Sequence, residues 1–256
     1  MYRDKSFSVR PLDQSLEDIR EAGKAYGHVV DTVFVADGDA LIMDTNHWMV
    51  LLEALNDAFP RLRRVSCYAM ASNVQEKSPD ELQMLRNGGL TRLYIGPETG
   101  DDQVMKRIAK GATFDDHVEA AQKAHAAKME ISVIALLGVG GVKRSQEHAE
   151  GMAKLVTAMD PEFFAALTTT VVPDTPLAKL EAKERFELPT IERMLEELRI
   201  MVDQARPTNA LFRTNHASNY LPLKGRLPRD RQQICDIIDM ALSGNIPLRP
   251  EWTRGL

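Results

Sequence analysis

The sequence has 256 residues, of which 44% are apolar and 27% are charged, and its formal net charge is −5 at pH 7. A chain of this length and composition can bury a sizeable core without a disulfide or a structural metal, which argues against a disordered protein and against a disulfide scaffold. The acidic balance argues against a broad nucleic-acid-binding surface. One basic group, Arg61–Arg64, falls at a junction between a predicted helix and a predicted strand, where we expect a solvated edge.

Membrane, secreted and metal-binding classes are also disfavoured. The longest apolar run, residues 131–142, is too short to cross a bilayer, and the amino-terminal residues contain no apolar signal core. The two cysteines, Cys67 and Cys235, form no CxxC pair and no Cys/His cluster, so the sequence predicts no metal site. We therefore expect a cytoplasmic protein.

Hydrophobic periodicity predicts strands that alternate with helices up to about residue 172. Because single helices separate the strands, we expect a parallel sheet with right-handed crossovers. Ser78, followed by Pro79, is typical of a helix start, and Gly88-Gly89 of its end. The predicted strands cover residues 31–36, 64–69, 93–96, 131–137 and 163–172, and the predicted helices cover residues 16–26, 46–59, 78–88, 101–109, 114–128 and 145–159.

Beyond Pro173 the pattern changes to helices, predicted over residues 177–187, 190–205 and 229–243. A polar, turn-rich stretch at residues 211–220 separates two of them. We therefore expect one α/β domain over residues 1–176, followed by a helical extension over residues 177–256.

Small and acidic residues follow each predicted strand, at residues 37–39, 70–73, 97–100, 138–141 and 173–176. Ligands of parallel α/β folds bind at the carboxyl ends of the strands, so this pattern indicates a site for a polar small molecule. Each segment also has a plainer interpretation as a turn or as an acid that leads a helix. The glycines at 138–141 do not match the dinucleotide fingerprint, because the GxGxxG order and the following acid are missing.

Taken together, these segments resemble the core of the radical S-adenosylmethionine superfamily. The resemblance is carried by FVADGDAL, YAMASN, GLTRLYIGPETGDDQVMKRIAKGAT, ISVIALLGVGG and TTTVVPDTPLAKL. The carboxyl-terminal FRTNHASNYLPLKGRLPRDRQQICDIIDMAL resembles Fe-S oxidoreductases of this superfamily, related to the anaerobic coproporphyrinogen oxidase branch. The resemblance implies a partial parallel (β/α) barrel with a carboxyl-terminal helical extension.

The resemblance also implies how S-adenosylmethionine would be held. Asp37, Gly38 and Asp39 stand where the family's Gly-Gly-Glu turn receives the methionine amino group, and this chain departs from that pattern. Glu98 stands where an acid holds the ribose hydroxyls, and Lys110 where a basic residue meets the methionine carboxylate. These pairings suit the chemistry of the groups. The remaining candidates are Ser72 and Asn73 after the second strand, and Gly138, Val139 and Gly140, whose backbone would lie against adenine.

The family's 4Fe-4S cluster is held by three cysteines that follow its first barrel strand, and this sequence shows no such triad. Met1-Tyr2-Arg3 and the Phe7-x-x-Arg10-Pro11 stretch match the segment that continues from the cluster loop. We therefore expect that the chain begins after that loop, without the first strand, and is inactive in reductive cleavage of S-adenosylmethionine. We assign no catalytic residue.

Several alternatives stay open on the sequence. The chain is either a shortened form of a working enzyme or a cluster-free module that binds a nucleoside-like ligand or a partner protein. A third alternative is a metal-independent enzyme that uses His216 or His47 as acid or base. Candidate contacts to an undefined substrate are Arg213, Asn215, His216, Asn219 and Tyr220, although the same residues would also suit a hydrogen-bonded turn.

The missing first strand would leave the strand at residues 31–36 as an unpaired edge. Pairing of this edge with the same edge of a second copy is one way to cover it, and we expect a homodimer.

Overall fold

The computed structural model describes residues 8–255. The matches at Met1-Tyr2-Arg3 and Phe7 lie outside these residues. The described residues form a seven-stranded sheet whose strands follow the chain order from β1 to β7. The predicted alternation of strands and helices is confirmed. The strands are β1 Thr32–Val35, β2 Arg64–Tyr68, β3 Leu90–Glu98, β4 Glu130–Leu137, β5 Phe163–Thr168, β6 Ala210–Arg213 and β7 Lys224–Leu227.

The sheet is largely parallel, as expected. β1 and β2 are parallel, as are β2 and β3, β4 and β5, and β5 and β6. β7 runs antiparallel to β6. The prediction that only helices follow residue 173 was wrong, because β6 and β7 both lie in that part of the chain.

The chain divides into two compact units. The described residues up to Tyr94, together with Lys123–Glu130, form the first unit, and Ile95–Gln122 with the described residues from Ile131 onward form the second. The predicted boundary between residues 176 and 177 lies inside the second unit. No helix in the described part of the chain is long and apolar enough to cross a membrane.

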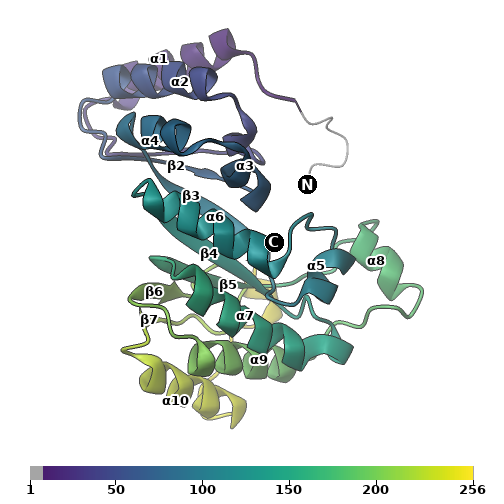
Figure 1. The fold of residues 1–256 in the computed structure, drawn as a ribbon. Helices are drawn as coiled ribbons and strands as arrows, with labels where there is room; N and C mark the ends of the chain where they lie inside the picture. The colour runs from purple at the N-terminus through teal and green to yellow at the C-terminus, as the bar shows by residue number, and fades with distance from the viewer. Residues whose placement is uncertain (1–7, 256) are drawn as a thin grey trace. The chain divides into compact units, whose positions relative to one another are not determined.

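The first unit packs helices against β1 and β2. Its helices α1 Leu12–Tyr26 and α2 Thr45–Ala58 lie side by side (Figure 1). Apolar residues spaced for one face explain α2, which buries Trp48, Leu51 and Leu55. The Trp48 indole donates from Nε1 to the carbonyl oxygen of Ala40 at 3.0 Å. The remaining helical elements are the 3-10 turn η1 Ala40–Ile42 and the helices α3 Ala71–Glu76 and α4 Pro79–Asn87.

The start of α4 confirms the capping chemistry predicted for it. The Ser78 hydroxyl accepts from the backbone N–H of Glu81 at 3.2 Å, and the Glu81 carboxylate accepts from the backbone N–H of Ser78 at 2.8 Å. α3 was not predicted as a helix. It is only six residues long and follows β2 directly.

An aromatic cluster joins β1, β2 and β3 in the first unit. The ring of Phe34 meets those of Tyr68 and Tyr94 edge to face, with centroid distances of 4.8 and 5.2 Å. Their neighbours Val65, Cys67 and Leu93 point to the other sheet face and are fully buried. This alternation is the two-residue period of a strand.

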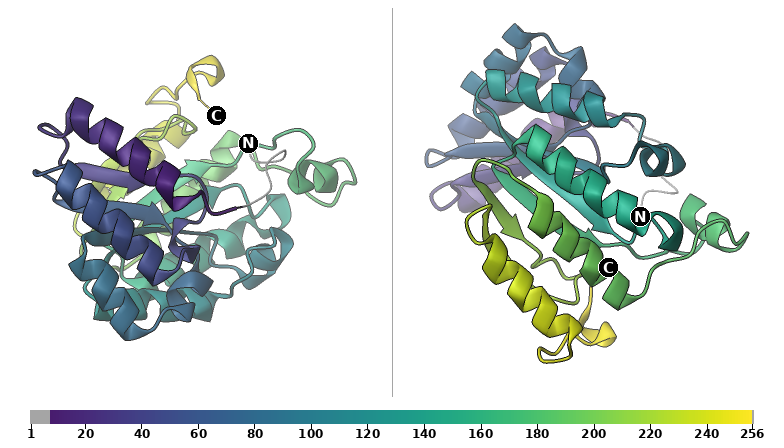
Figure 2. Two further views of the ribbon diagram at one scale, coloured as in Figure 1. Left: turned by 90° about the horizontal axis from the view of Figure 1, so that it is seen from above. Right: turned by 60° about the horizontal axis from the view of Figure 1, so that its bottom comes forward.

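The second unit places helices beside one another along the rest of the sheet. α7 Ser145–Met159 packs on α9 Ile191–Gln204, and α9 packs on α10 Arg231–Leu242 (Figure 2). Gly151 of α7 and Gly100, in the turn after β3, lack side chains, which lets the two backbones come into contact. Shorter elements are α5 Asp102–Arg107, η2 Val142–Arg144, α8 Pro176–Glu181 and η3 Glu251–Thr253, while α6 Phe114–Ala126 crosses the division between the units.

Candidate functional site

Glu98 ends β3 and faces a cation. Its carboxylate Oε1 lies 3.2 Å from Nζ of Lys110, and both side chains are about one fifth exposed. Glu98 adopts a positive φ of 68°, unusual for a residue with a side chain, so the chain turns sharply there. Burial raises the pKa of Glu98 above its ordinary value, although the Lys110 ammonium opposes this. The pair joins the last residue of a strand to the segment after α5.

Gly96 makes room for this carboxylate. A Cβ atom at Gly96 would lie 2.3 Å from Oε1 of Glu98, far inside van der Waals contact. The Glu98 side chain therefore folds back over the strand through the space that a glycine leaves. Both Glu98 and Lys110 were candidate residues from the sequence, and the structure brings them together.

The turn that follows Glu98 is anchored to α7. A Cβ atom at Gly100 would lie 2.0 Å from the carbonyl oxygen of Gly151 in α7, so the two backbones are in direct contact. The Asp101 carboxylate begins α5 by accepting from the backbone N–H of Gln103 at 2.8 Å. It also accepts from Nε and Nη2 of Arg144 at 2.8 and 2.6 Å. These contacts fix the turn.

The turn after β4 is a second candidate segment. Gly138 and Gly141 have φ values of 83° and 64°, which explains why glycines stand at these positions. The backbone N–H of Gly138 donates to Oε2 of Glu197 at 2.6 Å, and Nη2 of Arg107 donates to the carbonyl oxygen of Val139 at 2.7 Å. Gly138, Val139 and Gly140 are all buried. The side chains of Glu197 and Arg107 thus hold this turn through its backbone.

Sequence reasoning missed the buried residues that support both turns. Glu197 of α9 accepts from the Ser145 hydroxyl at 2.7 Å in addition to Gly138, and the side chain of Glu197 is fully buried. His148 of α7 contacts the Thr99 hydroxyl through Nδ1 at 2.8 Å, beside Glu98. Sequence separations of 49 and 52 residues connect these partners, so no local spacing could have revealed them.

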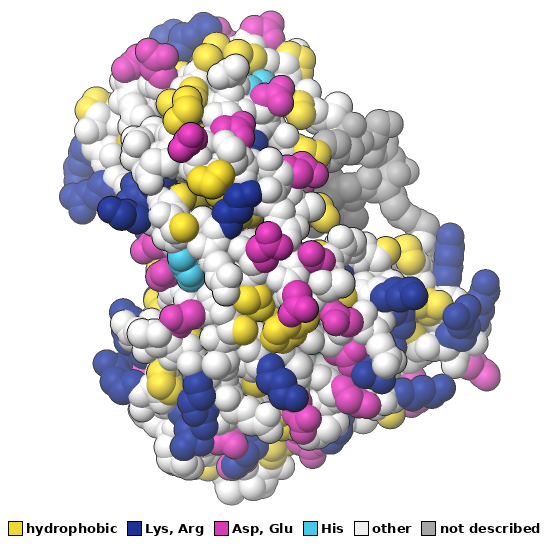
Figure 3. Space-filling view, in the orientation of Figure 1, with side chains coloured by type: hydrophobic (Ala, Val, Ile, Leu, Met, Phe, Trp, Pro, Cys, Tyr) yellow, Lys and Arg dark blue, Asp and Glu magenta, His cyan; other side chains and the backbone are white. Residues whose placement is uncertain are grey.

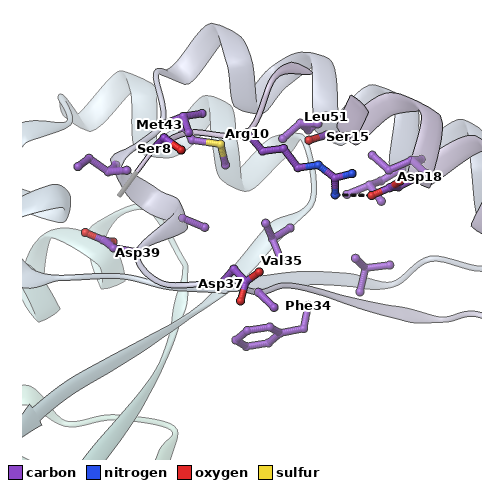
Figure 4. Close-up of a pocket in the computed structure, with 17 residues that line it drawn as sticks. Ser8, Arg10, Ser15, Asp18, Phe34, Val35, Asp37, Asp39, Met43 and Leu51 are labelled. Carbon is purple, nitrogen blue, oxygen red and sulfur yellow. Dashed lines mark hydrogen bonds and ion pairs between the residues drawn. The ribbon is translucent and has the colours of Figure 1, made fainter. Parts of the chain in front are cut away.

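Asp37, Gly38 and Asp39 lie in the first unit, beside a cavity of about 470 Å³ (Figure 4). Asp37 and Gly38 have φ values of 69° and 82°, so the chain turns sharply directly after β1. The Asp39 carboxylate accepts from the backbone N–H of Met70 at 3.3 Å. Figure 4 shows the Asp37 carboxylate close to Val35, with the Arg10–Asp18 ion pair farther along the cavity wall. Asp37 and Asp39 line the cavity and Gly38 does not.

Ser72 and Asn73 belong to α3 of the same unit. Asn73 is buried, and its Oδ1 accepts from the backbone N–H of Met70 at 3.1 Å, which caps the helix. Ser72 is partly exposed. Both Asn73 and Asp39 thus bind the backbone of Met70, which ties the turn after β1 to the turn after β2.

The carboxyl-terminal candidates divide into exposed and buried residues. Arg213, Asn215 and His216 are exposed. Asn219 is buried, and its amide donates to the carbonyl oxygens of Ala166 and Thr214 at 2.8 and 3.0 Å. Its Oδ1 accepts from the Thr168 hydroxyl at 2.9 Å, so the amide binds β5 as well as its own turn. The Tyr220 hydroxyl donates to the Glu251 carboxylate at 2.7 Å, and its ring lies under the guanidinium of Arg254 at 3.9 Å.

Comparison with known proteins identifies the family. Residues 2–156 match the family model of the radical SAM superfamily. The chain is 23% identical over 201 residues to the heme chaperone HemW of Bacillus subtilis (strain 168), which covers 76% of this chain and 52% of that protein. It therefore spans about half the length of this curated relative.

Solved structures share the fold at low identity. The coproporphyrinogen III oxidase HemN of Escherichia coli, described as a radical SAM enzyme, matches with a TM-score of 0.57 at 16% identity, over 75% of this chain and 44% of that one. The Elp3 protein of Methanocaldococcus infernus, with an amino-terminal deletion, matches with a TM-score of 0.58 at 16% identity, over 93% of this chain and 60% of that one.

The chain belongs to the radical SAM superfamily, as the sequence resemblance indicated. The proteins to which it is similar include HemW and HemN. Members of this superfamily use S-adenosylmethionine and a 4Fe-4S cluster, so both groups can be tested against the residues present.

The cysteines do not fit a cluster. Cys67 and Cys235 are both buried, at 0% and 1% exposure, and burial raises the pKa of each thiol, whereas iron ligation needs thiolates. The described residues contain no group of three or more His, Cys, Asp or Glu side chains that could hold a metal. For S-adenosylmethionine, the carboxylate of Glu98 and the ammonium of Lys110 do provide suitable polar partners.

Proposed function

We propose that the second unit carries nucleoside-binding residues of a radical SAM protein. In this proposal the Glu98 carboxylate accepts hydrogen bonds from the ribose hydroxyls of S-adenosylmethionine, and the Lys110 ammonium attracts the methionine carboxylate. The observation that carries the proposal is the Glu98–Lys110 pair at the carboxyl end of β3, with the carboxylate folded into the space left by Gly96. Ligands of parallel sheets bind at this end of the strands.

The Gly138–Gly140 backbone would provide a flat surface for adenine. This role is supported by the positive φ of Gly138 and by two hydrogen bonds that hold the turn. Glu197 accepts from the backbone N–H of Gly138, and Arg107 donates to the carbonyl oxygen of Val139. A rigid turn lowers the entropy lost when a ligand binds. The role of Asp37, Gly38 and Asp39 toward the methionine amino group stays a prediction, as do the roles of Ser72 and Asn73.

We further propose that this chain by itself does not cleave S-adenosylmethionine. The superfamily's cluster supplies the electron for that cleavage, and the two buried cysteines do not fit such a cluster. A cluster-free nucleoside-binding module is the form of the function that these residues favour. The substrate stays undefined, with Arg213, Asn215 and His216 as candidate contacts.

Calorimetry with S-adenosylmethionine and with adenosine tests the proposal. We expect wild-type binding in the weak range, at least tenfold loss for both ligands in Glu98→Gln, and a loss for S-adenosylmethionine alone in Lys110→Met, because adenosine has no carboxylate. Glu192→Gln removes an exposed carboxylate of α9 and serves as the matched control. Binding that is equal in Glu98→Gln and the wild type would place the nucleoside elsewhere.

A further inference from the structure

A second depression lies at the opposite end of the strands in the first unit. Its volume is about 660 Å³. Several of the residues that line it stand where strands begin: Thr32 opens β1, Arg64 opens β2, and Glu130 opens β4. Asp37, by contrast, follows the end of β1. The depression is therefore separate from the segments considered above.

Three arginines from two segments of the chain line this depression. Arg63 precedes β2, Arg64 is its first residue, and Arg86 lies in the last turn of α4. Within residues 8–255, the side chains of Arg63 and Arg64 form no hydrogen bond and no ion pair. Arg86 donates only from Nε, to the carbonyl oxygen of Lys128 at 2.8 Å, which leaves its two terminal nitrogens available. Figure 3 shows Lys and Arg side chains gathered at the left, beside the part of the chain that carries β2 and α4.

The carboxylates in the depression do not balance these charges. Oε2 of Glu130 accepts from Nε and Nη2 of Arg92 at 2.9 and 2.7 Å, and Arg92 is buried. The charge of Glu130 is thus compensated by an arginine outside the depression. Asp31 is the other carboxylate in the lining. The depression therefore has three guanidinium groups and one carboxylate, that of Asp31, whose charge is not compensated by a described arginine outside the lining.

We propose that this depression binds the phosphate group of a small phosphorylated compound. Guanidinium groups match the geometry of phosphate oxygens with paired N–H donors, and they are more weakly hydrated than ammonium groups. The hydroxyls of Thr32 and Thr91 line the same depression and add neutral donors. A carboxylate ligand can pair with the N–H donors of one guanidinium group, whereas the three terminal oxygens of a phosphate monoester can bind several guanidinium groups at once. The expected solvated edge at Arg61–Arg64 is accordingly divided: Arg63 and Arg64 line the depression and Arg61 does not.

Titration of the whole chain with inorganic phosphate and with pyrophosphate, at an ionic strength held constant with sodium chloride, tests this proposal. We expect saturable binding of both anions to the wild type. The Arg63→Gln/Arg64→Gln variant should bind at least tenfold more weakly. Arg61→Gln removes one positive charge from a position nearby that does not line the depression, so it is the matched control for the single variant Arg63→Gln and should bind like the wild type. Because Arg63 is exposed and has no partner among the described residues, the single Arg63→Gln variant should fold normally and should also bind more weakly than the wild type.

Three results would overturn the proposal. Absence of saturable binding in the wild type is one, and equal binding in the wild type and the folded double variant is another. Acetate that binds as tightly as phosphate would show that the depression responds to charge alone. None of these results bears on the Glu98–Lys110 site, because the two sites share no residue.

Discussion

The imidazole Nε2 of His148 lies 3.7 Å from Oε2 of Glu197, and neither side chain is exposed to solvent. Burial lowers the pKa of His148 to about 4 and raises the pKa of Glu197 to about 7. Desolvation penalises the charged form of each group, which explains why the two shifts have opposite directions. The pair thus sits uncharged beneath the two turns over a wide range of weakly acidic pH.

Replacing either residue of this pair should make the free energy of unfolding depend on pH, because the opposite contributions of His148 and Glu197 cancel in the wild type. His148 contributes stability above its ordinary pKa of 6.5, and this is lost as pH falls toward about 4. Glu197 contributes stability below its ordinary pKa of 4.5, and this is lost as pH rises through about 7. The two slopes therefore cancel between about pH 4.5 and 6.5. Glu197→Gln should become more stable with rising pH and His148→Asn less stable, each by on the order of 1 kcal/mol per pH unit.

Urea unfolding at several pH values within that window measures both slopes against the wild type. Glu192→Gln again provides a control, because its carboxylate is exposed. Slopes of the same sign in the two variants would contradict the assignment of a buried neutral pair.

A methyl group at Gly100 should destabilise the second unit strongly. Its Cβ would lie 2.0 Å from the carbonyl oxygen of Gly151, and backbone cannot give way as a flexible side chain does. We expect Gly100→Ala to lower the free energy of unfolding by about 3 kcal/mol. Gly111→Ala is the contrast, because open space surrounds that position and only its φ of 73° opposes a side chain, at about 1 kcal/mol. Equal losses in chemical denaturation would show that α7 moves away at little cost.

Anaerobic reconstitution of this chain with iron and sulfide should yield no stoichiometric 4Fe-4S cluster. The reason is that Cys67 and Cys235 are buried thiols with raised pKa values, and no third cysteine accompanies them. Iron and sulfide analysis together with the visible absorption spectrum measures the outcome. Stoichiometric iron accompanied by cleavage of S-adenosylmethionine would refute it, and the Cys67→Ala/Cys235→Ala variant would show whether either thiol was involved.

We propose a homodimer that pairs the edge strand β1 with its copy. β1 begins the strand order and is hydrogen-bonded to β2 on one side, while Val33 and Val35 line the cavity beside it. Such an edge favours pairing with another strand. Light scattering across a dilution series should show a concentration-dependent mass, and Val33→Lys should give a monomer, whereas Val142→Lys, an exposed position in the second unit, should not. A wild-type monomer at every concentration would defeat this proposal.

The elements that could be predicted from the sequence are those with strong local chemistry. Ser78 and Pro79 mark the start of α4, and the apolar spacing of α2 marks its buried face. β6 and β7 escaped prediction because each has four residues and carries arginine or lysine. Their strand character comes from pairing with neighbours rather than from periodicity.

The candidate site was predicted in part for the same reason. Glu98 and Lys110 stand twelve residues apart and belong to a motif that can be compared with a family. Glu197, by contrast, follows Glu196 in an amphipathic helix, where nothing in the local pattern distinguishes a buried carboxylate from a solvated one. Only the tertiary contact with Gly138 and Ser145 makes the distinction.

The intrinsic fluorescence of Trp48 can report on the first unit without an added label. Its indole is fully buried and hydrogen-bonded to Ala40, directly after the Asp37–Asp39 turn, while Trp252, in the second unit, is 86% exposed. The two emissions should differ in wavelength and in their access to an aqueous quencher such as iodide. With Trp252 replaced by phenylalanine, a single chromophore would report the melting of α2 and of the neighbouring turn, independently of events in the other unit.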